Sequence, residues 1–71
     1  MDTIRISLAA ARVNAELTQE QVAKKMNVGK QKIVDWEKGK TEPKVSEAVK
    51  LSDLYGIPLE NIFFKYNSYF K

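Results

Sequence analysis

Apolar residues recur at intervals of three and four along most of this chain, which is the spacing of one face of an α-helix. Residues 4–14 place Ile4, Leu8 and Ala11 on one stripe and predict a first helix. Similar spacings predict helices over residues 18–27, 30–38 and 45–55, and a short one over residues 58–63. No stretch alternates convincingly as a half-buried strand does. The pattern therefore predicts an all-α fold of five helices.

Residues typical of helix ends separate these segments. Thr18 and Gln21 have the spacing of a capping box, while Leu17 and Val22 occupy the two positions of a hydrophobic staple. Asn27 tolerates the left-handed conformation with which many helices end, and glycines end the next two helices at positions 39 and 56. Residues 40–43 are expected to form an exposed loop, because proline at position 43 disfavours helix before it.

The third predicted helix has two different faces. One face carries Ile33, Trp36 and Glu37, so we interpret Trp36 as a core residue. The opposite face is mostly polar and consists of Lys30, Gln31, Val34, Asp35 and Lys38. The fourth helix is expected to face the core with one stripe of residues, namely Val45, Ala48, Leu51, Ser52 and Tyr55.

With 71 residues, the chain is long enough for one small domain with a thin core. It has no cysteine and no histidine, which excludes disulfides, a Cys/His zinc site and an imidazole or thiol catalyst. We expect no enzymatic activity, no metal and no cofactor. No apolar run approaches the ~18 residues of a membrane span, and no secretory leader is recognisable. These features predict a cytoplasmic protein without a membrane partner.

Positive charge is concentrated in one segment. Residues 24–44 contain seven lysines against three carboxylates, a net charge of +4, whereas the whole chain has a net charge of +3. A confined positive field favours a polyanionic partner, although solvated lysines on a helix give the same pattern.

Two helices joined by a turn of about three residues, the second with a polar outer face, are typical of a helix-turn-helix. Residues 17–40, LTQEQVAKKMNVGKQKIVDWEKGK, resemble the core of the phage repressor and Cro (Xre-type) family. The resemblance extends over nearly the whole chain and leaves out only the last eight or so residues. It implies a five-helix bundle of the lambda-repressor type, in which the third helix enters the major groove of double-stranded DNA, usually as a homodimer.

Four side chains of the third helix are candidates for reading bases. The resemblance places Lys30 and Gln31 at the leading base-contacting positions, with Val34 and Asp35 one turn further on. Lys30 can donate to guanine O6 and N7, and Gln31 can bind adenine N6 and N7. Val34 can contact a thymine methyl group, and Asp35 can accept from cytosine N4, although its charge repels phosphate.

Further residues are expected to hold the DNA backbone or the fold. Gln19 matches the family's backbone clamp, and the phosphate-binding lysines are expected to be Lys32, Lys38 and Lys40. Arg12 and Glu37 match a largely buried ion pair that links the first and third helices. Gly29 departs from the family, which has serine or threonine at this helix start, so a capping hydroxyl is missing.

The C-terminal end is unusually aromatic. Residues 64–71 are interpreted as an extension to a DNA-binding domain of residues 1–63, and a dimer interface is expected at Phe64, Tyr66, Tyr69 and Phe70. A disordered or back-folded tail on a monomer is the alternative. The sequence thus predicts a DNA-binding transcriptional regulator of phage-repressor type. A protein-interaction or antitoxin-like accessory module that uses the same bundle is the second hypothesis.

Overall fold

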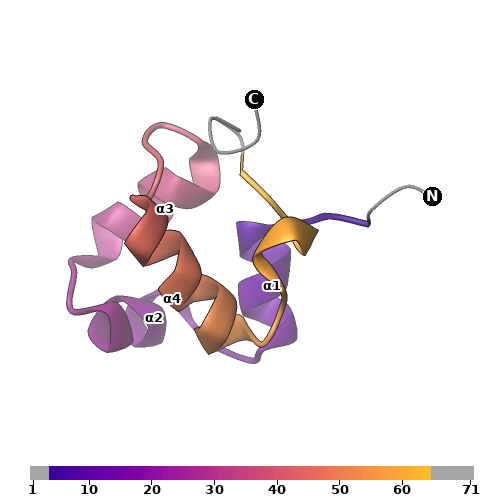
Figure 1. The fold of residues 1–71 in the computed structure, drawn as a ribbon. Coiled ribbons are helices and arrows are strands. Elements are labelled where there is room, and N and C mark those ends of the chain that lie inside the picture. Colours follow the sequence, from indigo (N-terminus) through magenta and orange to yellow (C-terminus); the bar gives the residue numbers. More distant parts are fainter. Residues whose placement is uncertain (1–3, 65–71) are drawn as a thin grey trace.

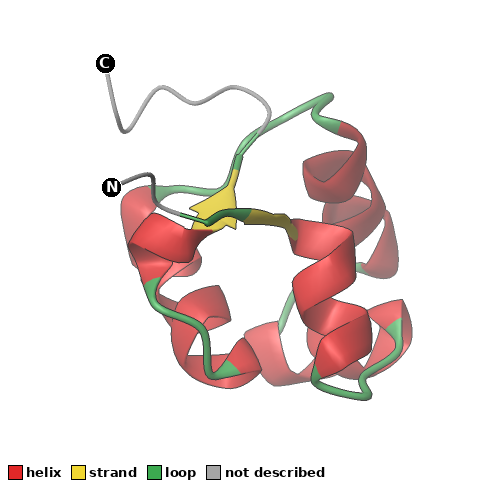
Figure 2. Cartoon of the chain, turned by 90° about the vertical axis from the view of Figure 1, so that its right-hand side faces the viewer, coloured by secondary structure: helices red, strands yellow, loops and turns green. Residues whose placement is uncertain are grey.

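The computed structural model of the chain describes residues 4–64. Within them, helices pack around one core, and a short parallel strand pair joins the two ends of the described chain (Figures 1 and 2). In chain order the elements are β1 (Ile6–Ser7), α1 (Leu8–Asn14), α2 (Gln19–Met26), α3 (Lys30–Lys38), α4 (Val45–Tyr55), the 3-10 turn η1 (Leu59–Asn61) and β2 (Ile62–Phe63). None of these helices is long and apolar enough to cross a membrane.

The first helix begins four residues later than the sequence predicted. Its N-cap is Ser7, whose hydroxyl accepts a hydrogen bond from the backbone N–H of Ala10 at 3.0 Å. Ser7 and the residue before it form β1, in which Ile6 pairs with Ile62 and Ser7 with Phe63. β1 lies beside β2 (Figure 2). The prediction of an all-helical chain without strands is therefore wrong in this detail, since a strand of two residues is too short to show alternation.

The predicted fifth helix is reduced to the single turn η1. After Asn61 the backbone becomes extended, with φ −102° and ψ 128° at Ile62, which allows β2 to pair with β1. The side-chain amide of Asn61 also donates to the carbonyl oxygen of Ile4 at 2.7 Å. The described residues thus contain four α-helices, and the predicted count of five is wrong, because pairing with β1 requires extended backbone here.

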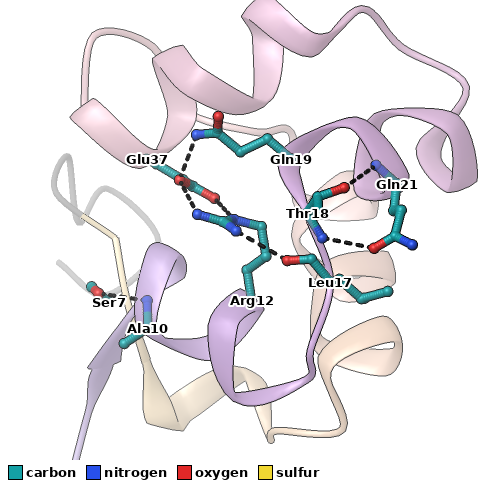
Figure 3. Close-up of polar contacts among 8 residues, drawn as sticks. All are labelled: Ser7, Ala10, Arg12, Leu17, Thr18, Gln19, Gln21 and Glu37. Atoms are coloured by element: carbon teal, nitrogen blue, oxygen red, sulfur yellow. Dashed lines mark hydrogen bonds and ion pairs between the residues drawn. The ribbon is translucent and has the colours of Figure 1, made fainter.

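The predicted capping box of α2 and the predicted ends of α2, α3 and α4 are confirmed. The Thr18 hydroxyl accepts from the N–H of Gln21 at 3.0 Å, and the Gln21 side chain accepts from the N–H of Thr18 at 2.8 Å (Figure 3). α2, α3 and α4 are each followed by a residue in the left-handed conformation, namely Asn27, Gly39 and Gly56. α4 starts differently, because the Glu47 carboxylate accepts from the backbone N–H of Lys44 at 2.8 Å.

The core draws on every helix and confirms Trp36 as a buried residue. It consists of Leu8, Ala11, Val22, Ala23, Met26, Ile33, Trp36, Ala48, Leu51, Tyr55, Ile62 and Phe64. Two expectations are wrong. Val45, expected inside, is 60% exposed at the start of α4, and Pro43, expected in an exposed loop, is fully buried.

The two phenylalanines at the end of the described chain have opposite environments. Phe63 is 42% exposed, whereas Phe64 is only 2% exposed. Successive side chains of extended backbone point to opposite sides, so Ile62 and Phe64 face the core while Phe63 faces solvent. The expectation that Phe64 belongs to a dimer interface is therefore corrected, because its side chain packs in the core of a single chain. The other expected dimer contacts, Tyr66, Tyr69 and Phe70, lie outside the described residues.

Candidate nucleic-acid interface

α2 and α3 form a compact unit joined by three residues, and they pack more extensively against each other than any other two elements (Figure 1). The turn is possible because Asn27 adopts the left-handed conformation, with φ 57°. The N–H of Val28 then donates to the carbonyl oxygen of Ala23 at 3.0 Å, which satisfies the end of α2. Gly29 is the N-cap of α3 and has extended backbone, with φ −75° and ψ 153°.

One face of α3 is fixed in the core and the other is open to solvent. Ile33 and Trp36 anchor the helix, with 1% and 3% of their surfaces exposed. On the other side Lys30, Gln31, Lys32 and Lys38 are exposed, while Val34 and Asp35 are half-buried. At about 100° per residue, Lys32 lies at the edge of the face that contains the other five. The structure thus groups the four expected base-reading residues on one accessible helix face.

Three polar side chains, one each from α1, α2 and α3, meet where these helices approach one another (Figure 3). Arg12 of α1 donates from Nε to Glu37 Oε2 at 2.7 Å and from Nη2 to Glu37 Oε1 at 3.3 Å. Its Nη1 donates to the carbonyl oxygen of Leu17 at 3.0 Å. Gln19, the first residue of α2, donates from Nε2 to Glu37 Oε1 at 2.9 Å. The predicted pairing of Arg12 with Glu37 is present, with 16% and 8% of the two side chains exposed.

This network sets the position of α3 relative to α1 and to the start of α2. Every side-chain nitrogen of Arg12 has an acceptor. The hydrogen bond to Glu37 raises the pKa of Arg12 above its ordinary value, against the opposing effect of burial. The sequence did not reveal the bond between Gln19 and Glu37, because 18 positions separate the two residues and no local spacing joins them. Gln19 as a phosphate ligand stays a prediction, and its half-buried amide is held by Glu37.

Two of the expected base-reading residues contact each other. Gln31 Nε2 donates to Asp35 Oδ1 at 2.9 Å, one helical turn further on. Glutamine and aspartate four residues apart on a helix are suited to this bond, so their spacing is a sequence signal for it.

The lysines expected to bind phosphate frame the same face. Lys38 is exposed at the C-terminal end of α3, about 12 Å along the helix axis from Lys30. Lys40 follows the left-handed Gly39, and its backbone N–H donates to the carbonyl oxygen of Asp35 at 2.9 Å, which ends the helix. Positive side chains therefore stand at both ends of α3.

We also searched residues 4–64 for metal sites and pockets. This part of the chain holds no group of three or more metal-ligating side chains and no pocket. The accessible polar face of α3 is the candidate site. Together with the fold, this face defines a helix-turn-helix protein of the class that binds nucleic acid.

Comparison with known proteins agrees with this class. A helix-turn-helix family model matches residues 8–62. An uncharacterized HTH-type transcriptional regulator of Methanocaldococcus jannaschii is 45% identical over 47 residues, which are 66% of this chain and 71% of the relative. A relative from Archaeoglobus fulgidus, also named as an uncharacterized HTH-type transcriptional regulator, is 33% identical over 60 residues, 84% of each chain.

The cryptic phage CTXphi transcriptional repressor RstR of Vibrio cholerae is 39% identical over 51 residues, which are 72% of this chain but 46% of the repressor. The match therefore spans less than half of that protein. No solved structure matched significantly. The chain belongs to the Xre/Cro-like helix-turn-helix family of transcriptional regulators.

Proposed function

We propose that this protein regulates transcription by binding double-stranded DNA with α3 in the major groove, most simply as a repressor. The observation that carries the proposal is the arrangement of α3. Its buried face is anchored by Ile33 and Trp36, and its opposite face presents lysine and glutamine side chains to solvent. The major groove, about 12 Å wide, admits one α-helix with such a face.

Base reading is assigned to the exposed face of α3. Lys30 and Gln31 lie in the first turn of the helix, the part that enters deepest in helix-turn-helix complexes. Lys30 donates to guanine and Gln31 binds the edge of adenine, while Val34 contacts a thymine methyl group. Asp35 is the fourth residue on this face.

Phosphate binding is assigned to residues around that face. Lys32, Lys38 and Lys40 supply contacts that do not depend on sequence, and the first turn of α2 offers backbone N–H groups to a phosphate oxygen. The side chain of Gln19 stands at this turn and already bonds to Glu37, so a phosphate contact there depends on the same network that holds α3.

Two copies of the chain are proposed to bind one operator. A single α3 contacts few base pairs, and a two-fold dimer places two such helices one turn of DNA apart, ~34 Å. The contact is assigned to Tyr66, Tyr69 and Phe70, since Phe64 is already used by the core.

Selection of bound sites from random duplex DNA tests this function. We expect an enriched motif made of two related half-sites, about one helical turn apart. Gln31→Ala and Lys30→Ala should each cost ~1–3 kcal/mol on that motif and relax preference at one base pair. A wild-type chain that enriches no sequence would contradict the proposal and favour the protein-interaction function.

A further inference from the structure

The hydrogen bond between Gln31 and Asp35 lies on the open face of α3, among the side chains assigned to base reading. Gln31 Nε2 donates to Asp35 Oδ1 at 2.9 Å, with Gln31 exposed and Asp35 half-buried. The bond stays within one helix and involves no residue of the core or of the Arg12, Gln19 and Glu37 network. A surface bond of this kind adds little to helix stability. Its effect falls on how the Gln31 amide is presented to a ligand.

The bond determines which end of the Gln31 amide faces outward along the helix. A carboxylate only accepts hydrogen bonds, so the Gln31 nitrogen must face Asp35 and the carbonyl oxygen Oε1 must turn away from it. One N–H is then occupied, and one N–H and Oε1 remain. These two groups are the donor and acceptor that adenine requires, because its major-groove edge presents N7 as an acceptor and the N6 amino group as a donor.

The same bond disfavours guanine at this position. Guanine presents two acceptors, N7 and O6, to the major groove. An unrestrained glutamine can turn both of its N–H groups toward them, but Gln31 has only one to offer while Asp35 holds the other. This loss of one donor lowers the affinity for guanine relative to adenine.

We propose that Asp35 is a positioning residue that restricts Gln31 to reading adenine. This inference rests on the proposed function, because it requires α3 to lie in the major groove. It gives Asp35 a role through Gln31 in place of the direct contact with cytosine that residue chemistry alone suggests. The negative charge of Asp35 costs overall DNA affinity and contributes selectivity in return.

Two variants of Asp35 separate positioning from charge. Asp35→Asn and Asp35→Ala remove the same negative charge, so the part of the affinity change that comes from charge should be similar in the two variants and should not depend on base sequence. Only asparagine keeps a carbonyl oxygen that can accept from Gln31 Nε2. The quantity to measure is the ratio of affinities for adenine and guanine at the base pair where Gln31→Ala relaxes preference, with all variants at one salt concentration.

We expect Asp35→Ala to reduce this ratio by roughly tenfold, and Asp35→Asn to keep it within about twofold of the wild-type value. In a Gln31→Ala background, Asp35→Ala should leave the ratio at that base pair unchanged, because the two residues act as one unit. Thermal unfolding of each variant verifies that the helix is intact.

Several outcomes would overturn the positioning role. They are an unchanged ratio in Asp35→Ala, equal losses in Asp35→Asn and Asp35→Ala, or a change confined to a different base pair, which would mean that Asp35 reads a base directly. In each of these cases the wild-type chain still selects a motif, and the proposed function stands. A wild-type chain that selects no sequence overturns the proposed function itself.

Discussion

Gly29 begins α3 without a side chain to cap it, although its backbone suits one. Its φ of −75° is accessible to serine, and a Cβ added there would meet no atom within 4 Å. Gly29→Ser should therefore stabilise the fold, by a few tenths of a kcal/mol from the cap and up to ~1 kcal/mol from reduced freedom of the unfolded chain. Thermal and urea unfolding measure the gain.

Gly29→Ala is the matched control, because alanine adds the Cβ without the hydroxyl. We expect the serine variant to be more stable than the alanine variant by ~1 kcal/mol. A lower melting temperature for Gly29→Ser would show that the glycine is required for another reason, such as close approach of the DNA backbone.

Tyr55 makes the stability depend on pH in the alkaline range. Burial raises the pKa of Tyr55 to about 12, and the nearby charge of Glu37 adds to the rise while Arg12 opposes it. A folded pKa above the ordinary value of 10 means that the stabilisation is complete below pH 10 and is lost as the pH rises toward 12. The loss should be roughly 2–3 kcal/mol.

Urea unfolding at several pH values between 9 and 12, compared with Tyr55→Phe, measures this loss. The two proteins differ only at position 55, so the difference between them isolates the contribution of the Tyr55 hydroxyl. An equal decline in both would rule out its contribution.

At the scale of elements, the placement of α3 depends on one carboxylate that accepts hydrogen bonds from two other helices. Glu37 accepts from Arg12 of α1 and from Gln19 of α2, and Ile33 and Trp36 hold the adjoining face in the core. The rotation of α3 about its own axis is thereby fixed, and so is the set of side chains that it exposes.

Glu37→Leu should destabilise the protein by about 3 kcal/mol, because it leaves the Arg12 guanidinium largely buried without its carboxylate. The double variant Arg12→Leu with Glu37→Leu removes both charges and should be less destabilised than Glu37→Leu alone. Urea unfolding of the single and double variants tests this, and strictly additive losses would contradict it.

The lysines at the C-terminal end of α3 should affect all DNA sequences alike. Lys38→Ala and Lys40→Ala should each weaken binding to every duplex about equally, and each should reduce the slope of log affinity against log salt by ~1. Lys50, exposed on α4 outside the α2 and α3 unit, provides the matched control. A loss confined to one sequence, or an equal change of slope in Lys50→Ala, would contradict the phosphate role.

For the whole molecule, the proposed dimer is tested by shortening the chain after Phe64. The core side chain Phe64 is kept, so the shortened chain should remain folded, although it loses the stabilisation that association gives the full chain. We expect sedimentation equilibrium at micromolar concentration to find a dimer for the full chain and a monomer for the shortened one. A full chain that is monomeric, or a shortened chain that dimerises as tightly, would exclude the assigned contact.

The parts of the fold that the sequence predicted are those determined by neighbouring residues. The capping box of Thr18 and Gln21, the end of α2 at Asn27 and the burial of Trp36 all depend on spacings within a few residues, and all are confirmed. The same local reasoning grouped the polar residues of α3 on one face.

The features that the sequence did not predict depend on contacts between distant segments. Pairing of Ile6 with Ile62 shortens α1, limits the predicted fifth helix to one turn and turns Phe64 inward. The bond from Gln19 to Glu37 likewise requires the packed α2 and α3. No local pattern contains this information, because it arises only when the helices are packed.

The strand pair also determines the order in which the molecule can assemble. It joins residues 56 positions apart, and closing a loop of that length costs roughly 3–4 kcal/mol. The hydrogen bonds between two-residue strands cannot offset this cost alone, since each contributes only ~1 kcal/mol. The helices must therefore collapse first and bring the two strands together. During synthesis, the core lacks Ile62 and Phe64 until that last segment has left the ribosome, so the final steps of folding take place after almost the entire described chain has been made.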